Sequence, residues 1–167
     1  SMQADRTKVP GFEVSAGSLG HGFPIAVGMA YGKKVQRQDG HVYVLAGDGE
    51  MNEGTMWEAA LYCGSERLDN LTLIIDDNHS IDVMINIRNI QDKMRAFGFE
   101  VIIANGHDIT DMRKALLFRQ SNKPVAIIAQ TKRGYGSATI MTDDAWFHRA
   151  PSEEELTRLK KEVDDFE

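Results

Sequence analysis

The sequence predicts an α/β protein built on a doubly wound parallel sheet. Along most of the 167 residues, apolar strand-like segments alternate with helical segments, and this alternation is typical of a parallel sheet with helices on both faces. Segment 71–76 is nearly all apolar, as expected for a strand that is covered on both sides. No internal repeat or linker interrupts the pattern, so we interpret residues 1–167 as a single domain.

The first half of the chain predicts a βαβ unit after an irregular start. Residues 1–22 are rich in glycine and are expected to be irregular. A helix is expected from Pro24 to about Val35, because proline is tolerated in a first turn. Strand 41–46 is followed by helix 55–65 and then by strand 71–76. One face of that helix carries Met56, Ala59, Ala60 and Cys63.

The second half continues the alternation. A helix over 89–97 leads to strand 100–104, and the next helix can be capped by Asp108 or Thr110. Strand 124–129 comes last. The apolar stripe of the first of these helices consists of Ile90, Met94 and Phe97.

The C-terminal part predicts a loop and one more helix. The loop covers 131–150 and contains glycines. Ser152 with Glu155 three residues later is a capping-box signature. The stripe of the final helix consists of Leu156, Leu159, Val163 and Phe166.

Composition excludes several classes of partner. A net charge of −6 argues against nucleic acid or an anionic membrane surface as the main partner. No apolar run approaches the ~20 residues needed to span a bilayer, and residues 1–10 do not form a signal peptide. The lone cysteine, Cys63, lies in an apolar helical row, which indicates a reduced thiol and a cytoplasmic location. Ser1 and Met2 look like a cloning remnant.

Two oxygen-bearing side chains follow neighbouring strands of the predicted βαβ unit. Asp48 follows the first strand between Gly47 and Gly49, and Asn78 follows the second about thirty residues later. Ligands bind at the carboxyl ends of parallel strands, and Mg²⁺ or Ca²⁺ prefers oxygen ligands completed by water or phosphate. The two glycines would let a phosphate approach the backbone. The alternative is two ordinary strand-to-helix turns, in which Gly, Asp and Asn are common.

This arrangement resembles the thiamine diphosphate motif of the transketolases, in which GDG precedes a terminal Asn by about thirty residues. In this chain the motif covers residues 47–78 and reads GDGEMNEGTMWEAALYCGSERLDNLTLIIDDN. Residues 9–22, 95–101 and 131–136 and the HRAP segment at 148–151 are also similar to that family. The resemblance implies a thiamine diphosphate-binding fold and a diphosphate-binding (PP) domain.

The resemblance also implies roles for individual residues. Asp48, Asn78 and the backbone carbonyl of Ser80 would bind the divalent ion. The amide of Gly49 would face the diphosphate, and Gly17 and Leu19 would approach the cofactor. Without the family, Leu19 would be read as a core residue equally well.

Two further residues match catalytic positions of the family. Glu53 matches a glutamate of a carboxylate network across the subunit interface, although it also suits a solvated position in a first helical turn. His148 matches a histidine that lines the cofactor phosphates and the substrate channel. Its alternative is an exposed loop histidine.

The family resemblance implies that this chain is half of a two-component enzyme. The other half would be a transketolase C-terminal-type subunit that carries the pyrimidine-binding domain, and together they would transfer a two-carbon ketol unit between sugar phosphates. We expect the upstream segment that carries sugar-binding histidines in the family to be missing, and loop 81–90 to be shorter. Two alternatives stay open: a truncated or non-catalytic module, or a component of a deoxyxylulose-phosphate-synthase-like or 2-oxo-acid dehydrogenase enzyme.

An interfacial site also predicts a homo-oligomer, because a domain built for such a site exposes apolar surface. We expect this surface to include the loop 17–23 and the start of helix 55–65. Met56 and Trp57 are the expected contact residues there, with a core position as their alternative.

Overall fold

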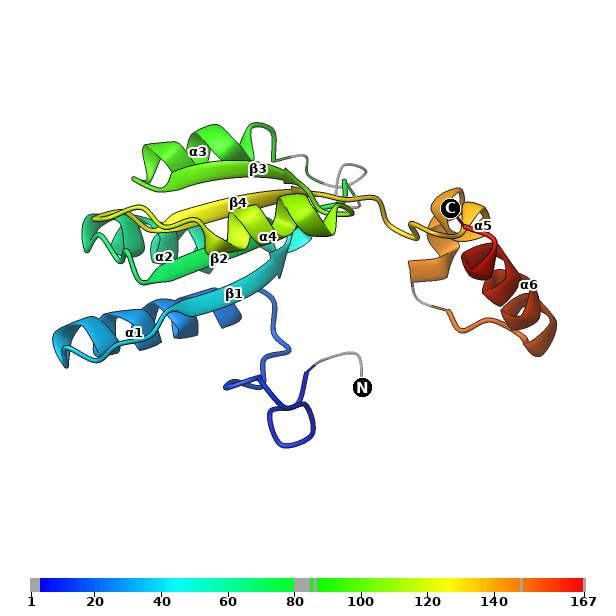
Figure 1. The fold of residues 1–167 in the computed structure, drawn as a ribbon, viewed down its shortest axis with the longest axis horizontal. Coiled ribbons are helices and arrows are strands. Elements are labelled where there is room, and N and C mark those ends of the chain that lie inside the picture. The colour runs from blue at the N-terminus through cyan, green and yellow to red at the C-terminus, as the bar shows by residue number, and fades with distance from the viewer. Residues whose placement is uncertain (1–3, 80–84, 86, 148, 167) are drawn as a thin grey trace. The chain divides into compact units, whose positions relative to one another are not determined.

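The computed structural model describes residues 4–79, 85, 87–147 and 149–166 (Figure 1). The chain divides into two compact units, residues 1–130 and residues 131–167. The first unit holds the sheet and the candidate site. In the described part of the chain, no helix is long and apolar enough to cross a membrane.

The sheet has four parallel strands in the order β1-β2-β4-β3. Each strand begins and ends within one residue of its predicted position, so the predicted α/β parallel architecture is confirmed. The strands are β1 (Val42–Gly47), β2 (Leu71–Asp77), β3 (Glu100–Asn105) and β4 (Val125–Gln130).

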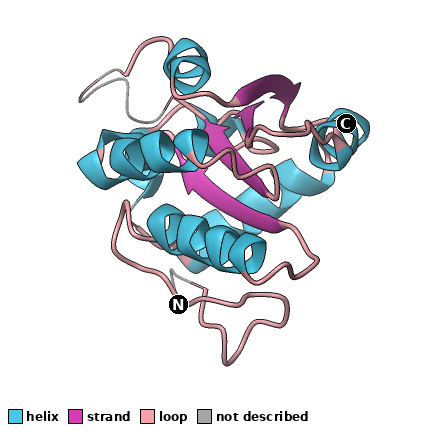
Figure 2. Ribbon diagram, turned by 90° about the vertical axis from the view of Figure 1, so that its left-hand side faces the viewer, coloured by secondary structure: helices cyan, strands magenta, loops and turns pink. Residues whose placement is uncertain are grey.

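Helices cover both faces of this sheet (Figures 1 and 2). One face packs against three helices in a single core cluster, while α4 packs on the other face beside β3 and β4. This is the doubly wound arrangement that the alternating pattern predicted. The helices of this unit are α1 (Gly22–Val35), α2 (Gly54–Ser65), α3 (Ile90–Ala96) and α4 (Ile109–Leu117), with a 3-10 turn, η1 (Gly49–Asn52), between β1 and α2.

Strand register explains which side chains form the main core. Val44 and Ala46 of β1 pair with Leu73 and Ile75 of β2, and these two pair in turn with β4. Burying each large apolar side chain stabilises the fold by about 1.5–3 kcal/mol. The main cluster includes Phe23, Val27, Met51, Met56, Cys63, Leu71, Leu73, Ile75, Met94, Ala126 and Ile128.

Met56 corrects one expectation. It is fully buried in the main cluster, because its position in the helical period points it at the sheet, so it cannot face a partner. Trp57 is partly buried and stacks on Phe97 of the same chain at 5.9 Å between ring centroids. Cys63 is buried, and burial raises the pKa of its thiol to about 12.

The predicted cap of α4 is resolved in favour of Asp108. Its carboxylate accepts the backbone N–H groups of Thr110 at 2.8 Å and Asp111 at 3.0 Å. These bonds satisfy two of the donors that an α-helix leaves open at its start.

The second unit contains two helical segments where a loop was expected over 131–150. They are α5 (Ala138–Met141) and η2 (Asp144–Phe147), and they are followed by α6 (Glu153–Asp164). Ser137 caps α5, and Glu162 of α6 accepts the Ser137 hydroxyl at 2.5 Å. The predicted capping box of Ser152 and Glu155 is confirmed. Of the predicted stripe on α6, Leu159 is buried and the other three members are exposed.

Candidate functional site

The carboxyl ends of the strands bring the predicted site residues of the first unit to one edge of the sheet. Gly47 of β1 is in register with Asp76 of β2, and Asp76 with Ala129 of β4. The backbone N–H of Asp48 continues this ladder by donating to the Asp76 carbonyl oxygen at 3.0 Å. A backbone hydrogen bond therefore joins Asp48 to the end of β2.

Asp48 is a buried carboxylate at this edge. Only 2% of it is exposed, and its Oδ1 accepts the backbone N–H of Gly49 at 2.7 Å at the start of η1. A carboxylate is costly to bury unless a cation or hydrogen bonds compensate its charge. Asp48 thus puts a buried carboxylate at the edge of the sheet where ligands of parallel sheets bind.

A cavity of about 270 Å³ opens beside Asp48. Its polar lining comes from the ends of β1, β2 and β4, from the turn that precedes α3 and from the first turn of α3, and its apolar lining consists of isoleucines. The lining residues are Asp48, Asp77, His79, Ile87, Arg88, Asn89, Ile90, Gln91, Ile103, Ile128 and Gln130.

Asn78 lies at the same edge, but its side chain is directed to a neighbour. Its Nδ2 donates to Asp76 Oδ2 at 2.9 Å, and the cavity is lined by Asp77 and His79 on either side of it. His79 has a backbone φ of 60°, which is uncommon for a residue other than glycine. Ser80, the third predicted metal ligand, lies outside the described residues.

The donor chemistry of this edge suits a hard cation. The described residues contain no group of three or more His, Cys, Asp or Glu side chains that could hold a metal. One carboxylate with neutral oxygens is instead the set that leaves room for water and phosphate oxygens around Mg²⁺. Asp48 and the amide oxygen of Asn78 fit that description.

The glycine-rich loop before α1 is fixed to the start of α2. The Gly20 N–H donates to Glu50 Oε1 at 2.9 Å, and Thr55 Oγ1 donates to the Gly20 carbonyl at 2.8 Å. A Cβ atom on Gly20 would lie 2.6 Å from Glu53 Cβ, and Gly20 has a φ of 78°. The loop and Glu53 are therefore in direct contact.

Three more of the predicted site residues lie on or beside this loop. Gly17 and Leu19 are exposed on the loop that Gly20 anchors, and Leu19 is 58% exposed, so its reading as a core residue is wrong. Glu53 is exposed beside Gly20. The sequence did not predict a role for Glu50. Its hydrogen-bond partner, Gly20, lies thirty residues away, and no local sequence pattern links the two.

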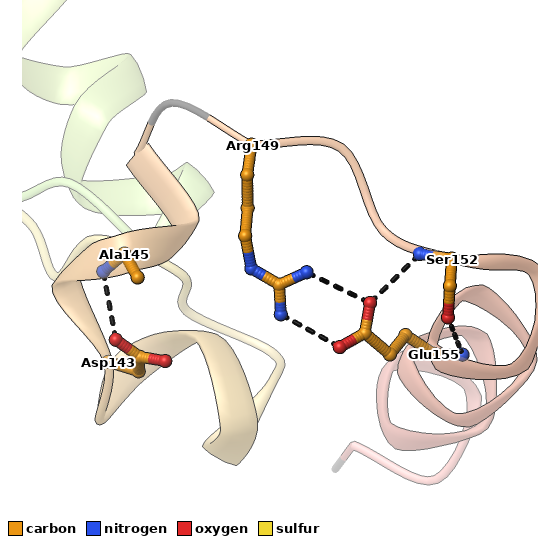
Figure 3. Close-up of polar contacts among 5 residues, drawn as sticks. All are labelled: Asp143, Ala145, Arg149, Ser152 and Glu155. Atoms are coloured by element: carbon orange, nitrogen blue, oxygen red, sulfur yellow. Dashed lines mark hydrogen bonds and ion pairs between the residues drawn. The ribbon is translucent and has the colours of Figure 1, made fainter.

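Arg149 organises the segment that contains the HRAP sequence in the second unit (Figure 3). It forms a bidentate pair with Glu155, at 2.9 Å and 2.8 Å, and lies over the Trp146 ring at 3.6 Å. The Ser152 N–H also donates to Glu155. Hydrogen bonding to Arg149 is the main cause that lowers the pKa of Glu155 to about 2. His148, the predicted catalytic histidine, lies outside the described residues.

Comparison with known protein families gives one match across nearly the whole chain. Residues 3–166 match the family described as "Transketolase, thiamine diphosphate binding domain". The matched segment includes the sheet, the cavity and the HRAP sequence.

Two curated relatives are named as subunits of transketolases. The chain is 38% identical over 165 residues to an apulose-4-phosphate transketolase subunit from Actinobacillus succinogenes, covering 95% of this chain and 59% of the relative. It is 36% identical over 141 residues to the 6-deoxy-6-sulfo-D-fructose transketolase subunit SqwG from a Clostridium species, covering 80% of this chain and 51% of the relative. The chain therefore spans only part of the length of these relatives.

Among solved structures, the chain is similar to a transketolase from Campylobacter jejuni. The TM-score is 0.81 at 35% identity, and the match covers 92% of this chain and 26% of that one. The fold of this chain is thus found within a much longer polypeptide.

Proposed function

Because this chain belongs to the transketolase thiamine diphosphate-binding domain family, we propose that it forms the diphosphate-binding half of a two-component transketolase. The complete enzyme would transfer a two-carbon ketol unit between sugar phosphates. The observation that carries this proposal is the buried Asp48 carboxylate beside a cavity at the carboxyl edge of the sheet. Both curated relatives described above are named as subunits, which supports the two-component arrangement.

The residues of the site have distinct tasks in this proposal. Asp48 and Asn78, with the Ser80 carbonyl, would hold Mg²⁺, and the glycines around Asp48 would leave room for phosphate oxygens. In this structure the Gly49 N–H donates a hydrogen bond to Asp48 Oδ1, and this bond orients the carboxylate. Thiamine diphosphate, once bound, would supply the chemistry that breaks and forms carbon–carbon bonds.

The glycine loop would complete the cofactor site on the first unit. Glu50 and Thr55 hold Gly20 from both sides, so Gly17 and Leu19 are presented on a fixed loop. Glu53, exposed beside this loop, is available to a carboxylate from the partner. We also propose His148 as the histidine that acts on the cofactor phosphates or the substrate, as its match to the family implies.

The partner in this proposal is a transketolase C-terminal-type subunit with a pyrimidine-binding domain. We also propose a cytoplasmic location, because the buried thiol of Cys63 suits a reducing compartment. Homo-oligomerisation is proposed because large apolar side chains are exposed on the outer sides of α1 and α2. They are Ile25, Tyr31, Leu61 and Tyr62, with Leu19 on the adjacent loop.

Calorimetric titration tests the proposal directly. Thiamine diphosphate is titrated into the chain with Mg²⁺, with EDTA in place of Mg²⁺, and with the candidate partner subunit present. We expect the titration to show Mg²⁺-dependent binding. In an activity assay of the same mixtures, we expect ketol transfer only when the partner is added. If thiamine diphosphate does not bind under any of these conditions, the proposed function is wrong.

A further inference from the structure

The cavity beside Asp48 has an uneven distribution of charge. It is lined by two carboxylates, those of Asp48 and Asp77, and by the imidazole of His79. Among the described lining residues, Arg88 is the one side chain with a permanent positive charge. In a chain with a net charge of −6, a local cation favours anion binding at this edge, so the way in which Arg88 is held is relevant to binding.

The backbone on both sides of Arg88 is anchored in the core. Ile90, the first residue of α3, is only 7% exposed, and Ile87 packs against the same core cluster. The intervening Asn89 has a left-handed backbone, with φ 58° and ψ 46°, and its carbonyl accepts the N–H groups of Asp92 and Lys93. Lys93 Nζ also donates to the Arg88 carbonyl.

The side chain of Arg88, in contrast, is exposed and lines the cavity. A fixed backbone with an exposed guanidinium is suited to binding, because little backbone order has to be gained when a ligand arrives. The planar guanidinium pairs with phosphate oxygens through two parallel hydrogen bonds. A carboxylate that holds a divalent cation on the same cavity would complement it.

We propose that Arg88 is a phosphate-binding residue of this cavity, which pairs with an anion whose divalent cation is held by Asp48. The anion is a phosphate or diphosphate group. The proposal rests on the proposed function for the cation at Asp48 and for the identity of that anion, which is the diphosphate of the cofactor or the phosphate of a sugar.

Binding measurements on the full chain test this role without an activity assay. Arg88→Gln and Arg88→Lys are compared with Arg95→Gln, which removes the same charge from α3, where Arg95 pairs with Asp92 at 2.8 Å and does not line the cavity. Each variant is titrated, with Mg²⁺ present, with inorganic diphosphate, thiamine diphosphate and ribose 5-phosphate. Circular dichroism verifies that each variant is folded.

We expect Arg88→Gln to weaken binding of at least one phosphate ligand by about 10- to 150-fold, the range for a hydrogen bond to a charged group. Arg88→Lys should lose less, because it keeps the charge, and Arg95→Gln should match the wild type. A loss confined to the two diphosphates identifies the cofactor as the source of the anion. A loss confined to ribose 5-phosphate identifies the sugar.

Other outcomes separate the two proposals. If the wild type binds inorganic diphosphate but not thiamine diphosphate, and Arg88→Gln weakens that binding, the role of Arg88 stands and the proposed function fails. If Arg88→Gln binds every ligand as the wild type does, or if the wild type binds none of them, the role of Arg88 is overturned.

Discussion

Glu50 accepts the backbone N–H of Gly20 at 2.9 Å, and this bond joins the glycine loop before α1 to the turn after β1. Thr55 completes the attachment by donating to the Gly20 carbonyl at 2.8 Å. Both backbone polar groups of Gly20 are thus satisfied by residues near Asp48. These bonds offset the conformational freedom that the loop gives up on folding, which is largest at its glycines.

Gly20→Ala should therefore lower the free energy of unfolding by about 2–4 kcal/mol. The new Cβ would lie 2.5 Å from Thr55 Oγ1, and alanine is also disfavoured at a positive φ, at a cost of about 1–3 kcal/mol. Gly11→Ala is the matched control, because Gly11 has a φ of 92° and no atom within 4 Å of the added Cβ. Urea unfolding measures both. Equal losses in the two variants would contradict the contact with Thr55.

Asp48→Asn should abolish most Mg²⁺-dependent binding of thiamine diphosphate while leaving the fold intact. We expect the affinity for thiamine diphosphate with Mg²⁺ to fall by more than about 100-fold. Substituting residues that only support the ligands of a metal site already lowers metal affinity by about 10- to 100-fold. Asn78→Ala should cost less, because a neutral oxygen can be replaced by water.

The control for Asp48 is Asp39→Asn, which makes the same charge change at an exposed position. Calorimetry gives the affinities. An Asp48→Asn variant that binds the Mg²⁺ complex as tightly as the wild type would remove Asp48 from the metal site.

Gly64→Ala should be among the most destabilising single substitutions in the first unit. A Cβ on Gly64 of α2 would lie 1.7 Å from the carbonyl oxygen of Phe97, so the backbone after α3 would have to move. We expect a loss of more than about 3 kcal/mol, as for other disrupted cores. Thermal and urea unfolding would measure it.

Gly28→Ala provides the control within another helix. An added Cβ there has no atom within 4 Å, and Ala is favoured over Gly in a helix interior by about 0.5–1 kcal/mol. We expect Gly28→Ala to be neutral or stabilising. If both glycine substitutions had the same effect, close packing would not explain Gly64.

His41 should make stability depend on pH below neutrality. Burial, with a smaller contribution from Arg119, lowers the pKa of His41 to about 4, and its Nε2 lies 2.8 Å from Thr72 Oγ1. Between about pH 4 and pH 6.5 the unfolded chain binds a proton that the folded chain does not, so stability rises with pH in this window and levels off above it. After allowance for solvent screening, the contribution is about 1–2 kcal/mol.

Urea unfolding from pH 4.5 to 7.5 measures this slope. The range covers most of the interval between the pKa of about 4 in the folded chain and the pKa near 6.5 expected in the unfolded chain. His41→Gln keeps a polar group near Thr72 but cannot titrate, so its stability should vary less over the same range. A His41→Gln variant with the full wild-type slope would assign the pH dependence to other groups.

The strands and most helices could be predicted from the sequence because their signals are local. Apolar alternation and turn residues fixed all four strands to within one residue, and the strand ends alone indicated where Asp48 would lie. The same local pattern put Met56 on one face with Ala59, Ala60 and Cys63, but whether that face meets the core or a partner was decided only by the structure, which buries it. Segments 138–141 and 144–147 carried no comparable periodicity over their short lengths, and a loop was predicted instead.

The rest of the site depends on contacts between distant residues. The bond from Gly20 to Glu50 spans thirty positions, and Arg88 reaches the cavity only because the core anchors Ile87 and Ile90. Neither follows from spacing. The surface available to a partner likewise depends on which side of α1 and α2 remains uncovered, and this required the packed structure.

That surface leads to the last prediction, which concerns self-association. Leu61 is 57% exposed on α2, and Tyr62 next to it meets Tyr31 of α1 in an edge-to-face contact at 5.7 Å. Exposed apolar patches of this kind are typical of interaction surfaces. We expect a homodimer or larger species at micromolar concentration, measured by light scattering and analytical ultracentrifugation.

Three glutamate variants distinguish this surface from the rest of the chain. Leu61→Glu should weaken self-association at least about tenfold, as expected for a contact residue, while stability stays within about 0.5 kcal/mol of the wild type. Leu117→Glu places the same charge at a leucine on α4 that is 66% exposed and should change neither property. Trp57→Glu should instead destabilise the fold, because Trp57 stacks on Phe97. A wild-type monomer at micromolar concentration, or equal association of the Leu61 and Leu117 variants, would show that α1 and α2 do not form the interface.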